Sequence, residues 1–138
     1  KPGASEHQSG LALDVCVNQY AGMGFLKSPV GEFINRESWK YGFIIRYPML
    51  HTRHTGIDFE PWHLRYVGEP HAQVCYENNL CLEEYIDSLQ TGRFYECEGY
   101  LITRQKASGN ILLPAEISSW RASLDNCGNL ILTGKKGE

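Results

Sequence analysis

Four polar side chains in the first half of the chain have types and spacings that suit a hydrolytic metal centre. His7 and Asp14 lie seven positions apart in "SEHQSGLALDV". Glu60 and His63 follow, three positions apart, in "EPWH". A catalytic zinc ion takes three protein ligands from His, Asp or Glu and keeps one position for water. A carboxylate that is not a ligand commonly acts as the base for that water, so the four residues together could supply both functions.

Two local features could bring these side chains together. A turn at Gly10 would return His7 to the start of the buried strand expected over residues 11–17, and glycine makes such a turn sterically easy. In a regular strand Glu60 and His63 would face opposite ways. The proline between them disfavours a helix interior and favours a bend or bulge, which would let both side chains reach one site.

The remaining patterns predict an α+β fold. Helices are expected over residues 30–42, 70–78 and 80–90, and further strands over 43–47 and 62–68. From residue 93 the chain changes to short strands joined by Gly, Asn and Asp turns, expected within 94–105, 110–114, 116–124 and 129–134. We therefore expect a core over residues 1–90 and a β-rich C-terminal extension over 91–138 that packs on it.

Composition excludes several classes of function. The net charge is −3 and no Lys/Arg run is present, which argues against nucleic-acid binding. No apolar stretch approaches the roughly 18 residues that a membrane span requires, and no signal peptide is visible. The five cysteines form no C-x-x-C pair, and their odd number favours reduced, buried thiols over a disulfide framework.

The order of these motifs resembles a known family. S-x-H-x-x-G-x-A-x-D over residues 5–14, followed by E-x-x-H over residues 60–63, resembles the signature of the D-alanyl-D-alanine metallopeptidases. This zinc group also contains lysostaphin-type endopeptidases and the Hedgehog signalling domain. "YGFIIRYP", "TGIDFEPWHLRYVG" and "LEEYI" resemble the vancomycin-resistance-type D,D-carboxypeptidases. More loosely, the C-terminal part is similar to the extension of some bifunctional D,D-dipeptidase/carboxypeptidases.

The resemblance implies a fold and a role for each matching residue. The core would be a small antiparallel sheet with flanking helices that bears a single Zn²⁺ site. His7, Asp14 and His63 would bind the ion. Glu60 would be the general base that takes a proton from the attacking water and passes it to the leaving amine.

The substrate side of the site is less defined by the sequence. The resemblance implies that Ser5 hydrogen-bonds the substrate, and Trp62 and Tyr47 are candidate pocket walls, although large aromatic residues are equally expected in the core. Family members normally carry an upstream "SGYRS"-like motif whose arginine holds the substrate carboxylate, and none precedes Lys1. We expect a piece of a longer protein or a truncated form, and we expect Arg65 to be an ion-pair partner.

Other candidate ligands have simpler interpretations. His51 and His54 have ligand-like spacing in "LHTRHTG", but the family motif does not include them, so both are expected to be exposed loop residues. Glu83 and Glu84 are expected on the solvated face of an amphipathic helix.

These observations predict a zinc D,D-carboxypeptidase that removes the terminal D-Ala from peptidoglycan precursors or stem peptides ending in D-Ala-D-Ala. D,D-dipeptidase and L,D-carboxypeptidase activities stay open. The alternative is a non-catalytic, zinc-stabilised module that binds cell-wall peptide or a partner; Glu60 favours the enzyme, whereas the missing arginine favours the module. The odd cysteine count and the C-terminal resemblance favour the cytoplasm. The extracytoplasmic face of the envelope, reached through a missing N-terminal anchor, is the alternative.

Overall fold

The computed structural model describes residues 3, 5–117 and 119–137. The chain divides into two compact units, unit 1 (Lys1–Tyr85) and unit 2 (Ile86–Glu138). The division falls inside helix α4 (Leu82–Ser88). The predicted packing of the C-terminal extension on the core stays a prediction.

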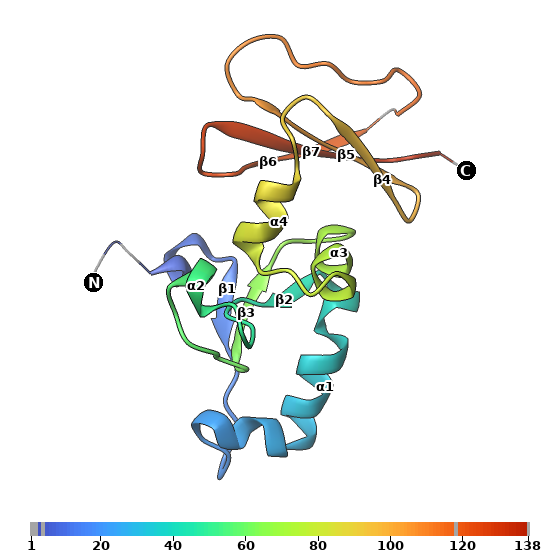
Figure 1. Ribbon diagram of the computed structural model, residues 1–138. Coiled ribbons are helices and arrows are strands. Elements are labelled where there is room, and N and C mark those ends of the chain that lie inside the picture. Colours follow the sequence, from blue (N-terminus) through green and yellow to red (C-terminus); the bar gives the residue numbers. More distant parts are fainter. Residues whose placement is uncertain (1–2, 4, 118, 138) are drawn as a thin grey trace. The chain divides into compact units, whose positions relative to one another are not determined.

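Unit 1 combines short helices with a small sheet (Figure 1). Its strands are β1 (Ala12–Asp14), β2 (Phe43–Ile45) and β3 (His63–Tyr66). Its α-helices are α1 (Pro29–Glu37), α2 (Thr52–Thr55), α3 (His71–Glu77) and the first part of α4, and its 3₁₀ helices are η1 (Glu6–Ser9), η2 (Gly22–Lys27) and η3 (Ser38–Tyr41). Within the described residues the strand order is β1-β3-β2, with both pairs antiparallel. The predicted α+β class and its small antiparallel sheet are confirmed.

Several elements of unit 1 differ in length from the sequence prediction. The helix expected over 30–42 is α1 followed by the tighter η3, and it stops at Gly42, whose φ of 79° is left-handed. Glycine adopts that conformation without steric cost, so the chain reverses there into β2. The strand expected over 11–17 is confined to Ala12–Asp14. One further hydrogen bond follows the strand pairing, from the Val15 amide to the carbonyl of Trp62 (3.0 Å), in the turn before β3.

Unit 2 is an antiparallel sheet of β4 (Phe94–Cys97), β5 (Tyr100–Lys106), β6 (Trp120–Leu124) and β7 (Asn129–Lys135) in the order β4-β5-β7-β6, counting described residues. Leu101, Ile102 and Leu132 are buried in its core. The predicted β-rich character of the C-terminal part is confirmed. Its strands pair as β4 with β5, β5 with β7, and β6 with β7.

The strand expected over residues 110–114 is absent, although the structure describes this whole segment. The side-chain amide of Gln105 takes the position of a neighbouring strand: its Nε2 donates to the carbonyl of Leu112 (2.6 Å), and its Oε1 accepts the amide of Leu112 (2.8 Å). A side chain that satisfies both backbone groups removes the need for a ladder partner. The alternation of residue types within 110–114 does not indicate this contact with a side chain seven positions away.

A buried ion pair anchors the end of β6. The Asp125 carboxylate accepts from Arg104 (Nε, 2.6 Å), from the backbone amides of Cys127 (2.7 Å) and Asn129 (2.9 Å), and from the Asn129 side chain (2.8 Å). Burial acts to raise the pKa of Asp125, but the hydrogen bonds from Asn129, Cys127 and Arg104 outweigh it and hold this pKa well below its usual range. The carboxylate therefore stays ionised in the folded sheet.

Replacing Asp125 by Ala should destabilise unit 2 by about 3–5 kcal/mol, because it leaves the largely buried Arg104 guanidinium without its carboxylate and two backbone amides without their acceptor. In the wild type, the depressed pKa of Asp125 stabilises the folded state at any pH above the pKa of Asp in the unfolded chain. This contribution to the free energy of unfolding is lost as the pH falls from that value through the lower pKa of the folded state. Hydrogen exchange of the β5 and β7 amides measures both effects. The exposed Asp87→Ala is the control, with an expected change within about 0.5 kcal/mol. Equal protection of the β5 and β7 amides in Asp125→Ala and wild type would contradict this expectation.

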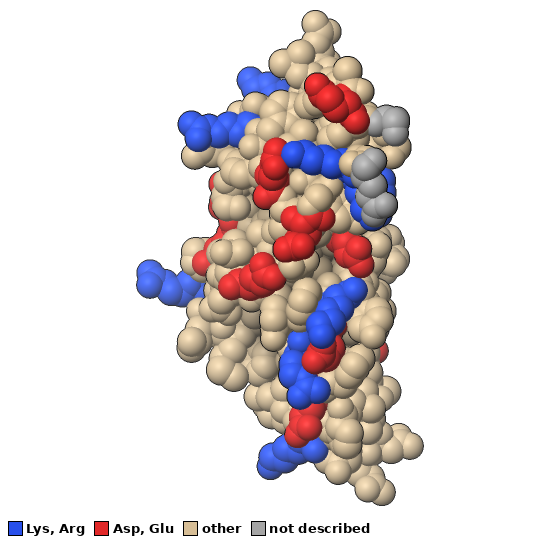
Figure 2. Space-filling view, turned by 90° about the vertical axis from the view of Figure 1, so that its right-hand side faces the viewer, with Lys and Arg blue, Asp and Glu red and all other residues tan. Residues whose placement is uncertain are grey.

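None of the helices formed by the described residues combines the length and apolar character that crossing a bilayer requires. On the face that Figure 2 draws, acidic and basic side chains are interspersed.

Candidate metal centre

The structure brings His7, Asp14 and His63 together from three elements. His7 lies on η1, Asp14 ends β1, and His63 begins β3 directly opposite Asp14 in the antiparallel register. Their ligand atoms all lie within 4.8 Å of one another. His63 Nδ1 is 3.0 Å from Asp14 Oδ1, and His7 Nε2 is 3.6 Å from Asp14 Oδ2. Three residues that are far apart in the sequence thus present nitrogen and oxygen atoms to one point.

Glycine at position 10 makes this geometry possible. Gly10 ends η1 with a left-handed φ of 72°, and its amide donates to the carbonyl of His7 (3.1 Å). The chain therefore reverses into β1, as the sequence predicted. The reversal also places His7 Nδ1 at 3.2 Å from the carbonyl of Ala12, which it satisfies as a donor. With Nδ1 so occupied, Nε2 carries the free lone pair that a metal needs.

His63 is held in the same way, by Glu6. His63 Nε2 lies 2.8 Å from Glu6 Oε1, so it donates to the carboxylate and leaves Nδ1 directed at Asp14. The His63 side chain is only 8% exposed, and its ring packs at 4.8 Å from the ring of Tyr47. Carboxylate–histidine pairs of this kind orient metal-binding imidazoles and raise their basicity.

The donor set fits a tetrahedral zinc ion. With bonds of about 2.0–2.2 Å, tetrahedral ligand atoms lie about 3.3–3.6 Å apart. The distances from the two Asp14 oxygens, 3.0 Å from Oδ1 to His63 Nδ1 and 3.6 Å from Oδ2 to His7 Nε2, are similar to that spacing. His7 and Asp14 are 40% and 53% exposed, so the site is accessible from solvent on one side. A site with three ligands and an open side corresponds to catalytic rather than structural zinc.

Glu60 lies beside this group without belonging to it. The chain turns at Pro61, the amide of His63 donates to the carbonyl of Glu60 (3.2 Å), and both side chains reach the same side. Glu60 Oε2 is 3.6 Å from His63 Nδ1, and the side chain is 32% exposed. The turn has a further support, because Asn35 Nδ2 on α1 donates to the carbonyl of Pro61 (3.1 Å). The bend predicted for "EPWH" is therefore present.

The three residues predicted to contact substrate differ in their surroundings. Tyr47 is buried against His63, and burial together with the charge of Glu6 raises the pKa of its hydroxyl. Trp62 is half-buried in the turn before β3. Ser5 is exposed and precedes η1, and its hydroxyl makes no capping hydrogen bond. Tyr47 thus lies against a candidate ligand, whereas the roles of Ser5 and Trp62 remain predictions.

Sequence reasoning missed Glu6, which organises the inner side of the site. Its Oε2 accepts from Arg65 Nη1 (2.7 Å) and Arg46 Nε (3.1 Å), and Arg46 also makes a two-pronged contact with Glu83 (2.6 and 3.0 Å). Burial acts to raise the pKa of Glu6, but the hydrogen bond from His63 and the two arginines hold this pKa below its usual range. The signal in the sequence was Arg65 on β3 together with Arg46 directly after β2, because two half-buried arginines so close together need a carboxylate partner. The ion-pair role expected for Arg65 is confirmed.

Two expectations for other side chains were wrong. Glu83 is not simply solvated, since it pairs with Arg46. Glu84 accepts the backbone amide of Cys81 (3.0 Å) and pairs with His51 (2.7 Å), which is buried rather than exposed. The Arg46–Glu83 and His51–Glu84 pairs join residues more than thirty positions apart, so local patterns could not indicate them.

Replacing Glu6 by Gln should weaken zinc binding about 10–100-fold, because the neutral amide makes His63 a less basic ligand. Competition against a chromophoric chelator measures the affinity. Glu83→Gln is the matched control: it also removes a carboxylate from Arg46, and Glu83 pairs with that arginine rather than with a candidate ligand. Its zinc affinity should therefore match the wild type. An equal loss in both variants would show that Glu6 acts through general destabilisation.

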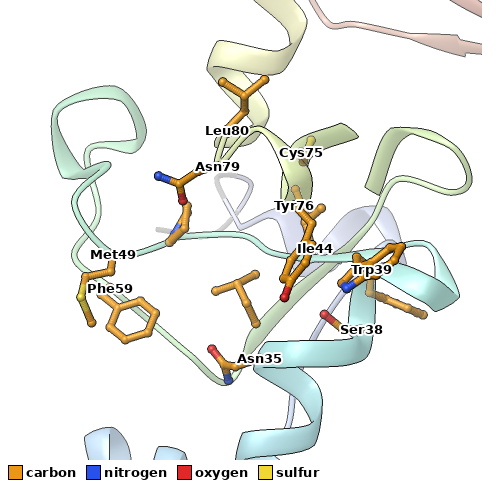
Figure 3. Close-up of a pocket in the computed structure, with 13 residues that line it drawn as sticks. Asn35, Ser38, Trp39, Ile44, Met49, Phe59, Cys75, Tyr76, Asn79 and Leu80 are labelled. Atoms are coloured by element: carbon orange, nitrogen blue, oxygen red, sulfur yellow. The ribbon is translucent and has the colours of Figure 1, made fainter. Parts of the chain in front are cut away.

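A separate hollow of unit 1 lies away from these residues (Figure 3). Asn35, Ser38 and Trp39 line it on one side, and Tyr76, Asn79 and Leu80 on another, with Met49 and Phe59 at its edge. Trp39 and Tyr76 stack with ring centroids 5.1 Å apart. Its lining includes neither the three candidate ligands nor Glu60, so this hollow is separate from the candidate metal centre.

Comparison with known proteins gives a consistent result. A family model described as "VanY: D-alanyl-D-alanine carboxypeptidase" matches residues 1–69. A D-alanyl-D-alanine carboxypeptidase of Enterococcus faecium is 45% identical over 114 residues, covering 74% of this chain and 36% of the relative. The bifunctional D-Ala-D-Ala dipeptidase and carboxypeptidase VanXYC of Enterococcus gallinarum is 44% identical over 93 residues, covering 64% and 49%. The chain thus spans about a third to a half of the curated relatives it matches.

Solved structures extend the likeness. The vancomycin-resistance D,D-dipeptidase VanXYg, in complex with a D-Ala-D-Ala phosphinate analogue, has a TM-score of 0.79 at 28% identity and covers 99% of this chain and 60% of its own. A VanY variant from a VanB-type resistance cassette, in complex with Zn(II), has a TM-score of 0.53 at 43% identity, covering 62% and 46%. The resemblance inferred from the motifs is confirmed, and this chain belongs to the VanY family of D-alanyl-D-alanine carboxypeptidases.

Proposed function

We propose that this chain carries the zinc-binding and proton-transfer residues of a D,D-carboxypeptidase that removes the terminal D-Ala from peptidoglycan stem peptides or precursors. The observation that carries the proposal is one free carboxylate, Glu60, beside three converging ligand atoms. A purely structural zinc site has no use for such a group. The relative named as bound to Zn(II) and the D-alanyl-D-alanine carboxypeptidases among the relatives support the metal and the substrate class.

The proposed reaction is hydrolysis of the peptide bond before the terminal D-Ala. His7, Asp14 and His63 would hold zinc, which when bound polarises the scissile carbonyl and acidifies water. Glu60 would accept a proton from the attacking water as the new C–O bond forms. The same carboxyl would then give the proton to the amine of D-Ala as the C–N bond breaks. Each water consumed yields one shortened peptide and one free D-Ala.

The rigid inner side of the site supports its catalytic use. Glu6, held by two arginines, would keep His63 in a single orientation. The exposed outer side formed by His7 and Asp14 would leave room for the peptide. Preorganised ligands on one side and an accessible side for substrate are what hydrolysis at a metal requires.

Dipeptidase activity is a finer proposal that two similar proteins support. VanXYC is named as both a dipeptidase and a carboxypeptidase, and the likeness to VanXYg covers nearly all of this chain. We propose that free D-Ala-D-Ala is a second substrate.

We also propose a reducing compartment, the cytoplasm, because an odd number of cysteines favours reduced thiols over a disulfide framework. Cys75 and Cys81 are buried as expected, whereas Cys16 and Cys127 are exposed.

The deciding experiment measures zinc content and D-Ala release on the same preparation. The substrates are a stem pentapeptide ending in D-Ala-D-Ala, a stem tetrapeptide and free D-Ala-D-Ala. Zinc with release from the pentapeptide supports the carboxypeptidase, and release from the free dipeptide supports the second activity. The preparation could bind zinc and show no turnover, even after the family's upstream segment is joined to the chain. That result would contradict the enzyme proposal and favour a peptide-binding module.

A further inference from the structure

A second group of ligand-type side chains lies in unit 1, outside the candidate metal centre. Among the described residues, His51, Cys81 and Glu84 each offer one ligand atom, and these atoms lie within 4.8 Å of one another. His51 is 8% exposed and Cys81 is fully buried. Together they form what we call the 51/81/84 cluster. Met49 precedes His51 by two positions, and Leu80 directly precedes Cys81; both line the hollow of Figure 3.

Local structure holds the cluster in place before any ion is considered. His51 immediately precedes α2, and Cys81 immediately precedes α4. Glu84, in the first turn of α4, accepts the Cys81 amide (3.0 Å), which fixes its carboxylate at the helix start. His51 Nδ1 lies 2.7 Å from Glu84 Oε2, and His54 Nε2 lies 3.3 Å from Glu84 Oε1. Two histidines of one short segment thus meet the same carboxylate.

The 51/81/84 cluster contains one more ligand-type side chain than an ion pair needs. Ionisable groups are buried only when they are paired or bind a metal. A pairing of His51 with Glu84 would satisfy those two residues without a thiol. Cys81 adds a sulfur atom directly at the pair, and nitrogen, sulfur and carboxylate oxygen are together the donors that zinc and similar borderline ions take.

We propose that His51, Cys81 and Glu84 form a second site for a zinc-class divalent ion. Because His51 and Cys81 are buried, a substrate would have little access to the ion, which would be structural. It would tie the segment around α2 to the start of α4. On binding, the Cys81 thiol gives its proton to solvent and the thiolate takes the metal. This site is independent of the hydrolytic function proposed above.

Cobalt substitution tests the site, because the two sites differ in one donor atom. The His7, Asp14 and His63 centre contains no sulfur, so a thiolate-to-cobalt charge-transfer absorption can come only from a cysteine. We expect the full chain to bind two equivalents of Co²⁺ and to show that absorption. Cys81→Ser should bind one equivalent and lose the absorption.

Cys75→Ser is the matched control, since Cys75 is another buried free thiol of unit 1; it should keep both equivalents and the absorption. Absence of the charge-transfer absorption in the wild type, or its persistence in Cys81→Ser, would overturn the proposal. If Cys81→Ser does not fold, His51→Gln keeps the thiol and removes one ligand. The Co²⁺ affinity of this variant, measured by titration of the charge-transfer absorption, should fall at least about tenfold. An unchanged affinity would overturn the proposal.

Discussion

Replacing Glu60 by Gln is expected to lower kcat for D-Ala release by about 10²–10⁴-fold while zinc stays bound. Glutamine has nearly the same shape but accepts no proton, so the attacking water loses its base. Zinc should stay because Glu60 lies outside the group of three close ligand atoms. Metal content and steady-state kinetics on a stem pentapeptide, measured on the same sample, check both parts.

The control for Glu60 is Asp58→Asn in the same loop. Asp58 is exposed and accepts a long hydrogen bond from Thr52 (3.4 Å). Removing its charge should leave kcat within about twofold, which corresponds to a few tenths of a kcal/mol. Full turnover in Glu60→Gln would show that Glu60 is not the general base. Loss of zinc in that variant would show that Glu60 is a metal ligand.

Replacing His63 by Ala should abolish zinc binding at the candidate centre and with it the zinc-dependent stability. At a free zinc concentration 100-fold above Kd, a single site stabilises the wild type by about 2.7 kcal/mol. The variant loses a buried ligand, and Glu6 loses one of its hydrogen-bond donors. Thermal unfolding with and without zinc measures the difference.

The His63 experiment uses Cys81→Ser as its background, so that the 51/81/84 cluster does not contribute. His71→Ala is the control, because His71 contacts Tyr85 (2.5 Å) in another part of unit 1. Its zinc-dependent stabilisation should equal that of the background. If His63→Ala kept the zinc-dependent rise in stability, the ligand set would be wrong.

The two experiments separate catalysis from binding. Loss of turnover with zinc retained identifies a proton-transfer role, whereas loss of both identifies a ligand. If neither variant changed turnover, the active site of the whole protein would lie outside these residues.

The sequence alone determined the local features of this site. Residue types and spacing indicated the family, and Gly10 and Pro61 indicated the two turns, because turn geometry depends on the backbone preferences of a few neighbouring residues. The α+β class followed for a similar reason, since periodicity reflects which side chains of each element are buried.

The partners of these residues became known only from the folded arrangement of the chain. Glu6 is a neighbour of His7 in sequence, yet its importance comes from arginines forty and more positions away. The Gln105 side chain binds the backbone of Leu112, in a segment that was expected to be a strand. Glu84 pairs with His51, which was expected to be exposed to solvent. Such contacts depend on how strands register and helices approach, and a hydrogen bond between distant side chains leaves no periodic trace along the chain. The ligand types were therefore readable from the sequence, whereas the groups that orient them became visible only in the fold.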